Sequence, residues 1–271
     1  MVKKLFKHEI LSYLRLLLPV YLILLGIGAI GRFIQCFEAD TITYDLLRGS
    51  SLFAFMVAIS VSMLLTTIFC VLRFYKNMFT GEGYLTFTLP VTTTQHLLTK
   101  LAVAVMAMIA TVMAVLLSAC VLFAGEWLVE ICKAISYMLG TILAEMSALH
   151  FWLYIGEMVL LALITVIAEL LVYYMCICLG QTFRKNRILA AIGIYFGLYM
   201  ITQVLFTFFS IFFSVVAVNW TWLEDLFKLI EKYPYETVHV VLCGASVVML
   251  TLGSLYYWIC HSVIRKKLNL E

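Results

Sequence analysis

The chain has 271 residues, of which 65% are hydrophobic and only 12% are charged. Soluble globular domains carry about 25% charged residues, so this composition excludes an ordinary water-soluble domain. The net charge of +3 is small. The sequence has no basic region interleaved with aromatic residues, so it gives no indication of a nucleic-acid partner. The 8 cysteines are scattered and lie mostly in apolar stretches, where cysteine acts as a small hydrophobic residue, so we predict no metal site.

Six long apolar blocks follow one another along the chain. Each holds about 20 residues or more, enough for a helix to cross a hydrocarbon core of about 30 Å. We therefore expect an all-α integral membrane protein with six transmembrane helices, in which the whole chain, 1–271, forms one transmembrane domain. The predicted spans are 16–37, 51–72, 101–124, 151–180, 188–218 and 238–261.

The polar connections between these blocks alternate in charge, and the alternation predicts the orientation. The basic stretches are 3–15, 73–100, 184–187 and 265–267, and the acidic stretches are 38–45, 126–145 and 224–236. With both termini on the cytoplasmic side, 13 of the 18 Lys and Arg residues fall in cytoplasmic segments and 4 in outer ones. Because cytoplasmic loops retain Lys and Arg, we expect both termini to be cytoplasmic.

The segment 1–15 has an amphipathic pattern. Apolar residues lie on one helical face and polar residues on another, the former being Phe6, Ile10, Tyr13 and Leu17 and the latter Lys4, His8, Ser12 and Arg15. The pattern predicts an N-terminal interfacial helix, and ordinary basic flanking sequence is the alternative. Pro19 then favours a bend early in the first span. A short outer helix or re-entrant turn is expected over 219–237, ending before Pro234.

Two acidic residues, Glu157 and Glu169, lie within the predicted fourth span. Ionisable groups at such positions usually face a partner or a wet cavity. Glu157 and Glu169 are about 120° apart around a helix, so they do not form a carboxylate pair, whereas His150 shares the face of Glu157. A substrate or proton path is one interpretation. Pairing with a polar residue of a neighbouring span, or placement at the membrane interface, is the other.

Motifs of soluble enzymes do not account for this chain. The stretch GIGAIG at 26–31 has the letters of a dinucleotide-binding fingerprint, but it lies inside a predicted membrane helix, with no strand before it. Close packing of helices explains its glycines better. Since the sequence has no Gly-Lys dipeptide, it has no P-loop for binding nucleotide. We predict no catalytic residues and no cofactor bound by this chain.

The connection 73–100 carries the most specific sequence, EGYLTFTLPV at 82–91 followed by LLTKL at 97–101. Its apolar residues would be exposed unless a partner covers them, and the threonines after Pro90 are suited to cap the next helix. The two stretches resemble the segment after the second span in ABC-2-type permease subunits of low-GC Gram-positive bacteria. Elsewhere the resemblance is architectural, in the interfacial helix, the six spans and the outer elements before the last span.

The resemblance implies a cytoplasmic coupling helix between the second and third spans that contacts a separate ABC ATPase subunit. The implied contact residues are Glu82, Gly83, Tyr84, Leu85, Phe87, Leu89 and Pro90. It also implies a second permease chain, identical or paralogous, in the bacterial cytoplasmic membrane, with ATP and Mg held by the ATPase. The pathway would draw on spans one, two and five, with Thr202, Gln203, Thr207 and Ser210 as candidate lining residues or as packing polar groups.

The expected function is therefore export of an amphipathic or hydrophobic peptide or drug-like compound. An ion-coupled secondary transporter is one alternative, which a proton or sodium gradient would drive without ATP. An intramembrane enzyme using His150, Glu157 and Glu169 is another. The sequence leaves open which cargo is moved, and it is equally compatible with an accessory role in immunity or sensing.

Overall fold

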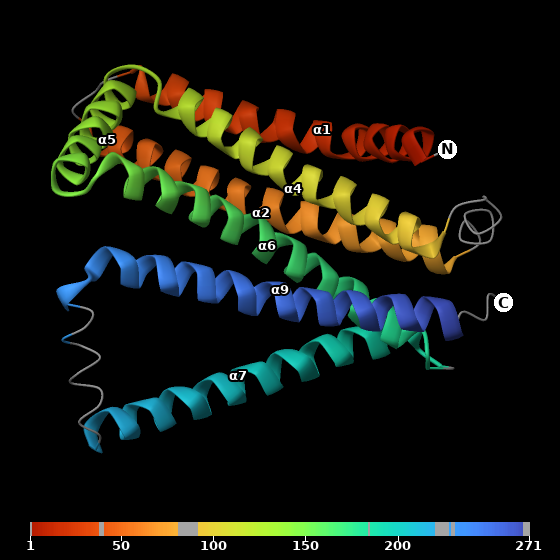
Figure 1. The fold of residues 1–271 in the computed structure, drawn as a ribbon. Helices are drawn as coiled ribbons and strands as arrows, with labels where there is room; N and C mark the ends of the chain where they lie inside the picture. Colours follow the sequence, from red (N-terminus) through yellow and green to blue (C-terminus); the bar gives the residue numbers. More distant parts are fainter. Residues whose placement is uncertain are drawn as a thin grey trace. The chain divides into compact units, whose positions relative to one another are not determined.

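The computed structural model of this protein describes residues 2–37, 41–80, 92–183, 185–219, 228 and 231–267. Within these residues the regular structure is entirely α-helical, which confirms the predicted all-α class (Figure 1). The helices are α1 (Val2–Gln35), α2 (Ile42–Phe79), α4 (Thr93–Leu122), α5 (Glu126–Glu145), α6 (Ala148–Gly180), α7 (Arg187–Asn219) and α9 (Pro234–Lys267). All 7 of these helices are long and apolar enough to cross a membrane, which indicates a multi-pass membrane protein.

The helices form two compact units, residues 1–145 and 146–271. In the first unit α1, α2 and α4 pack on one another in all three pairs. Leu24, Phe55 and Leu122, one from each helix, make a common buried core. Further along, the hydroxyl of Thr111 lies 2.9 Å from both the Tyr21 hydroxyl and the Thr66 hydroxyl, so one chain of polar groups links the three helices.

Glycines of the 26–31 stretch bring α1 close to α4. A Cβ atom added at Gly28 would lie 2.8 Å from the backbone oxygen of Ser118, and one added at Gly31 would lie 2.5 Å from Leu122. Gly26, two residues away, has nothing within 4 Å. The glycines at 28 and 31 therefore serve helix packing, as expected for small residues between membrane helices.

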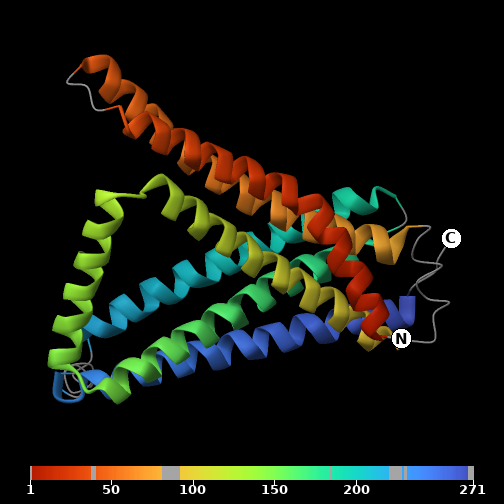
Figure 2. The same cartoon turned by 90° about the horizontal axis from the view of Figure 1, so that it is seen from above.

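The N-terminal segment is helical and continuous with the helix that follows it. α1 runs without interruption over 34 residues, from Val2 to Gln35, and so includes both the predicted interfacial segment 1–15 and most of the predicted first span. Pro19 lies inside α1 and has no backbone N–H to donate to the preceding turn. Figure 2 shows that the axis of α1 changes direction between its N-terminal turns and the remainder, as a proline favours.

Several helices extend beyond the predicted spans because hydropathy locates the apolar part of a helix and not its ends. α2 continues through the polar turn around Asp45 and Arg48. α4 begins before the predicted span 101–124, after Thr92, whose hydroxyl accepts a hydrogen bond from the Gln95 N–H while the Gln95 side chain bonds back to Thr92. This reciprocal cap confirms the prediction that a threonine after Pro90 caps the helix.

The helix α5 was not predicted, because the acidic residues of 126–145 marked this stretch as a connection. It follows α4 after a turn at Gly125, whose φ of 103° suits glycine. The guanidinium of Arg48 lies over the Trp127 ring, 5.3 Å from its centre, and ties the start of α5 to α2. Figures 1 and 2 show α5 running at a steep angle to α4. None of its apolar window is buried within the protein.

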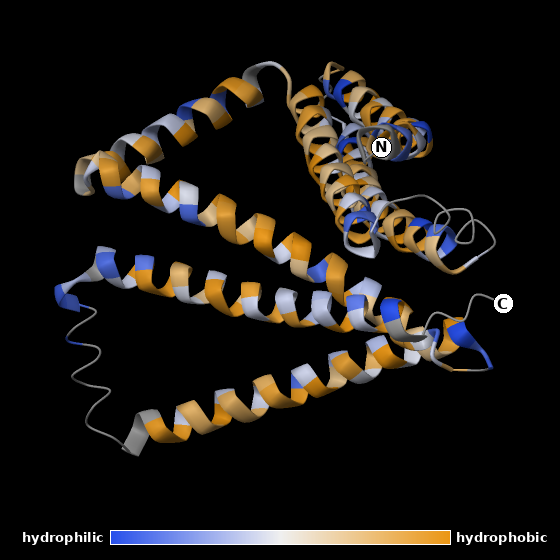
Figure 3. Cartoon of the chain, turned by 45° about the vertical axis from the view of Figure 1, so that its right-hand side comes forward, coloured by the Kyte–Doolittle hydropathy of each residue, from blue (hydrophilic) through white to orange (hydrophobic). Residues whose placement is uncertain are grey.

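In the second unit α6 packs on both α7 and α9. α6 and α7 approach closely where Gly180 meets Ala191, since a Cβ at Gly180 would lie 2.7 Å from the Ala191 side chain. None of the apolar window of α7 is buried, and Figure 3 shows hydrophobic residues along most of this helix. Between α6 and α9 the buried Cys178 and Cys260 thiols lie 3.0 Å apart.

Two predicted elements fall largely outside the described residues. These are the coupling segment, with residues 81–91 outside, and the outer helix or turn, with residues 220–227 and 229–230 outside. The element after them begins at Pro234, the first residue of α9, a position at which proline is favoured because the first turn needs no N–H donor.

The close contact at Gly28 predicts a position-specific loss of stability. Gly28→Ala should lower the free energy of unfolding by about 1–3 kcal/mol, because its Cβ would press on backbone that cannot move aside alone. Gly26→Ala, with open space at its Cβ, should leave stability unchanged or slightly raised. Denaturant unfolding of both variants in detergent micelles measures the difference, and equal stability of the two would contradict this packing role.

Candidate functional site

The residues with the most specific sequence, Glu82–Pro90, lie outside the described part of the chain, so the site is built from the two helix ends that flank them. α2 ends at Phe79, and α4 begins at Thr93. Both ends carry charged side chains that turn inward to the N-terminal part of α1, at one end of the first unit.

Glu9 of α1 is the centre of this arrangement. Its residue is only 4% exposed, yet its carboxylate accepts hydrogen bonds from three side chains of two other helices. Arg73 Nε donates at 2.7 Å, Asn77 Nδ2 at 2.9 Å and Lys100 Nζ at 3.0 Å. Because Arg73 and Asn77 belong to α2 and Lys100 to α4, one carboxylate joins α1 to both helix ends that flank the 81–91 connection.

Arg73 makes further contacts with α1. Its second nitrogen donates to the Ser12 hydroxyl at 2.5 Å. Its guanidinium also lies over the Tyr13 ring, 5.1 Å from the ring centre. A planar guanidinium can form a forked bond and stack on an aromatic face at the same time, which a lysine ammonium cannot do. Arg73 therefore orients α1 against α2 as well as supplying charge.

We call Glu9, Arg73, Asn77 and Lys100 the Glu9 cluster. Its effect on stability depends on how deeply its charges are buried. The side chains of Glu9 and Lys100 are 6% and 5% exposed, so water screens their attraction little. Two cations surround one anion, which leaves the cluster with a single net positive charge. Removing one partner of such a buried set is costly, since the remaining charge stays desolvated without compensation.

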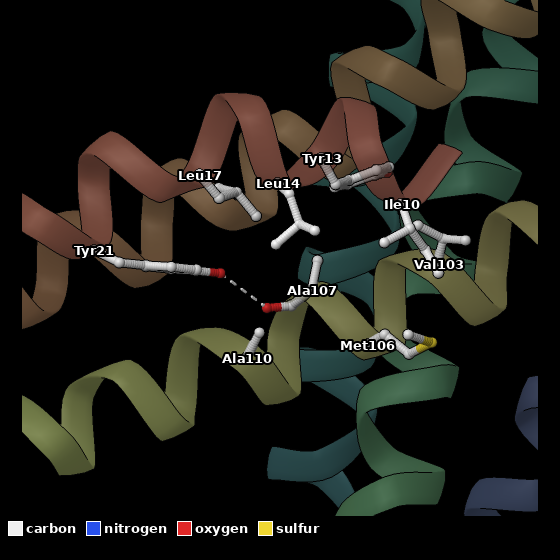
Figure 4. A pocket seen from close by; sticks show the side chains of 9 residues that line it. All are labelled: Ile10, Tyr13, Leu14, Leu17, Tyr21, Val103, Met106, Ala107 and Ala110. Carbon is white, nitrogen blue, oxygen red and sulfur yellow. Dashed lines mark hydrogen bonds between the residues drawn. The ribbon is translucent and has the colours of Figure 1, made fainter. Parts of the chain in front are cut away.

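A shallow apolar groove of about 100 Å³ lies beside the cluster, between α1 and α4. Figure 4 shows its lining side chains, which are Ile10, Tyr13, Leu14, Leu17, Tyr21, Val103, Met106, Ala107 and Ala110. The Tyr21 hydroxyl lies 3.3 Å from the Ala107 backbone oxygen, which accepts its hydrogen bond. The remaining wall is formed by aliphatic and aromatic carbon, which suits an apolar chain and not a charged ligand.

The two acids predicted within the fourth span lie on α6 and have separate partners. The Glu157 carboxylate bonds to Nδ1 of His239 on α9, with its two oxygens at 2.9 and 2.8 Å. Glu169 accepts a hydrogen bond from Tyr173 at 3.0 Å, one turn along the same helix. The two acids are roughly 18 Å apart along α6, so they do not share a site.

The four polar residues predicted on the fifth span lie on an exposed part of α7. The hydroxyl of Thr202 donates to the backbone oxygen of Tyr199, and that of Thr207 to Gln203. A hydroxyl that bonds to its own helix is satisfied even in lipid. The structure therefore brings Thr202, Gln203, Thr207 and Ser210 to one stretch of α7 without joining them to another described helix.

Sequence reasoning missed two central residues, Glu9 and His239. Glu9 borders the apolar face of Phe6, Ile10 and Tyr13, and an acid at the edge of an apolar face in a basic segment is a signal that could have found it. His239 gives only a weak signal, a histidine near the start of the last span. Its partnership with Glu157 depends on α6 and α9 being neighbours.

Comparisons with known proteins identified no similar protein. A scan against protein-family models, a search of curated proteins and a search of solved structures each found no match.

The Glu9 cluster predicts a large effect of one conservative change. Glu9→Gln keeps the side-chain shape but removes the negative charge that Arg73 and the buried Lys100 share, and we expect the free energy of unfolding to fall by about 3–5 kcal/mol. Lys7→Gln, an exposed change two residues away on α1, should alter it by less than about 0.5 kcal/mol. Chemical unfolding in mixed micelles measures both, and a wild-type stability of Glu9→Gln would refute the importance of the carboxylate.

Proposed function

We propose that this chain is the membrane-spanning permease subunit of an ATP-binding-cassette exporter in a bacterial cytoplasmic membrane, energised by a separate ATPase subunit. The observation that carries the proposal is the Glu9 cluster, which joins α1 to both helix ends that flank the 81–91 connection. The sequence of that connection, with its resemblance to ABC-2-type permeases, is the second support.

The Glu9 cluster would transmit a movement of the 81–91 connection to α1. Arg73 lies six residues before the end of α2 at Phe79, and Lys100 seven residues after the start of α4 at Thr93. A force applied to the 81–91 connection therefore enters both helices within two turns of Glu9. Because the carboxylate bonds to both, the N-terminal part of α1 would move with them. In the proposed mechanism, closure of the ATPase on bound ATP and Mg supplies this force.

The proposed topology keeps six spans and cytoplasmic termini, and it places α5 along the outer membrane surface. Support comes from the faces of α5. One face is apolar, formed by Leu128, Ile131, Ile135, Met138, Leu139 and Ile142, and the other carries Glu130 and Lys133. A helix with such opposed faces is suited to lie in the interface plane. A seventh span would instead bring the two basic ends of the chain to opposite sides, against the distribution of Lys and Arg.

We propose an amphipathic or hydrophobic cargo and a second permease chain. The apolar groove between α1 and α4 supports the cargo class, because it offers carbon surface and no charged group. The apolar length of α7, none of which is buried, supports the second chain, since a helix that packs mainly on one neighbour has faces left for lipid or for another subunit. Thr202, Gln203, Thr207 and Ser210 would then face the pathway between the two chains.

An ion-coupled secondary transporter is the second candidate, because the carboxylate of Glu157 is bonded to a histidine at 2.8 Å, a pairing suited to bind and release protons. The intramembrane enzyme has less support, since Glu169 is paired with Tyr173 and lies apart from Glu157.

Co-purification from native membranes tests the exporter proposal. A P-loop ATPase should be recovered with the tagged chain, and its recovery should be lost when Tyr84, Leu85 and Phe87 are changed together to Ala. The matched control changes Thr86 and Thr88 of the same connection to Ala, which should leave the ATPase bound because the apolar contact is kept. Membrane insertion of each variant is checked by protease protection.

The opposite outcome is equally informative. If no ATPase is recovered under conditions that preserve membrane complexes, and a proton or sodium gradient alone drives transport in liposomes, the exporter proposal fails and the secondary transporter replaces it.

A further inference from the structure

Three side chains near the start of α6 and α9 form a continuous hydrogen-bonded chain. The Glu157 carboxylate contacts Nδ1 of His239 at 2.8 Å, and Nε2 of His239 contacts Nδ1 of His150 at 3.0 Å. Both ring nitrogens of His239 are thus engaged, one by a carboxylate of α6 and the other by an imidazole of α6. We call Glu157, His239 and His150 the histidine triad.

Proton counting limits the states of this triad. The 3.0 Å contact between His150 and His239 needs one N–H and one lone pair, because two N–H groups cannot point at each other. In the state in which Glu157 is a carboxylate, His239 donates its Nδ1 proton to it. With both imidazoles neutral, His150 donates to His239, and both contacts are satisfied.

One further proton fits without loss of either contact. It is taken on the free nitrogen of His150, or on Nε2 of His239 while His150 shifts its own proton to its other nitrogen. The single positive charge is then balanced by Glu157. A second proton on the two imidazoles cannot be accommodated, since both nitrogens of the 3.0 Å contact would carry hydrogen and two cations would face each other.

The surroundings allow protons to reach the triad, and its described neighbours are aromatic, acidic and thiol side chains. The side chains of His239 and Glu157 are 17% and 21% exposed. From α6 the neighbour is Tyr154, whose ring centre lies 4.2 Å from that of His239, and from α9 the neighbours are Tyr235, Glu236 and Cys243. α7, the other helix packed on α6, carries no Asp, Glu, Lys, Arg or His between residues 188 and 216.

The triad also holds two neighbouring helices together at one end. There the Tyr154 hydroxyl also donates to the Tyr235 backbone oxygen at 2.8 Å, so the triad is one of two polar links between α6 and α9 at this end. Near the other end the buried Cys178 and Cys260 make a second close contact, 28 residues or roughly 42 Å further along α6. Loss of the histidine contact would therefore free one end of the pair and leave the other packed.

We propose that the histidine triad is a proton-binding site that fastens α6 to α9. The two imidazoles retain one added proton between them, and a second proton on this pair separates His150 from His239 and opens this end of the helix pair. This proposal is independent of the exporter assignment, because it rests on contacts within the second unit alone.

Distance measurement by electron paramagnetic resonance tests the proposal on the full chain in lipid nanodiscs. Spin labels are placed on Leu149→Cys and Val240→Cys, whose parent side chains are 67% and 70% exposed, after the 8 native cysteines have been replaced. The interspin distance should increase by several ångströms between pH 8 and pH 5. His150→Asn should keep the short distance at both values, because an amide can present either a donor or an acceptor to His239 and does not titrate.

His261→Asn is the matched control, a histidine of α9 that stacks on Tyr257 outside the triad, and it should keep the full wild-type response. If His150→Asn does not fold, His239→Gln replaces it with the same expected loss of pH response. A distance that does not change with pH in the parent, or an equal change in the triad variants, would overturn the proposal.

Discussion

The carboxylate of Glu9 is the group on which one end of the first unit depends. Lipid offers no water to a buried charge, so an acid among membrane helices persists only where other side chains replace its hydration shell. Arg73, Asn77 and Lys100 do this for Glu9, and each comes from a helix other than its own. The hydrogen bonds that compensate for burying this charge therefore also hold three helices in a fixed arrangement.

The same constraint sorts the remaining polar groups into two kinds. Some bond across helices, as Thr111 does with Tyr21 and Thr66, and these fix which helices are neighbours. Others, such as Thr202 on α7, bond back to their own helix and impose no neighbour. This difference explains why α1, α2 and α4 form a close set while α7 contacts mainly α6. Binding surfaces for lipid or another subunit are expected on helices of the second kind.

Much of the fold could be predicted from the sequence because membrane helices follow local rules. The apolar blocks located six helices, and the starts of α4 and α9 follow from the cap at Thr92 and from Pro234. α5 was missed because its acidic residues outweighed the regular spacing of its apolar face. The partners of Glu9 and Glu157 could not be predicted, since each is set by which helices lie side by side, and one sequence does not specify that.

The length of α2 has a mechanical consequence. Its 38 residues extend about 57 Å, nearly twice the hydrocarbon thickness of about 30 Å. Such a helix is a rigid rod that reaches beyond the bilayer, with the Glu9 cluster near one end and the Arg48–Trp127 contact near the other. A tilt of about 5° about one end displaces the other by about 5 Å over this length. α2 is therefore a lever that would carry a small rotation at the 81–91 connection to α5, without any change in its own internal hydrogen bonds.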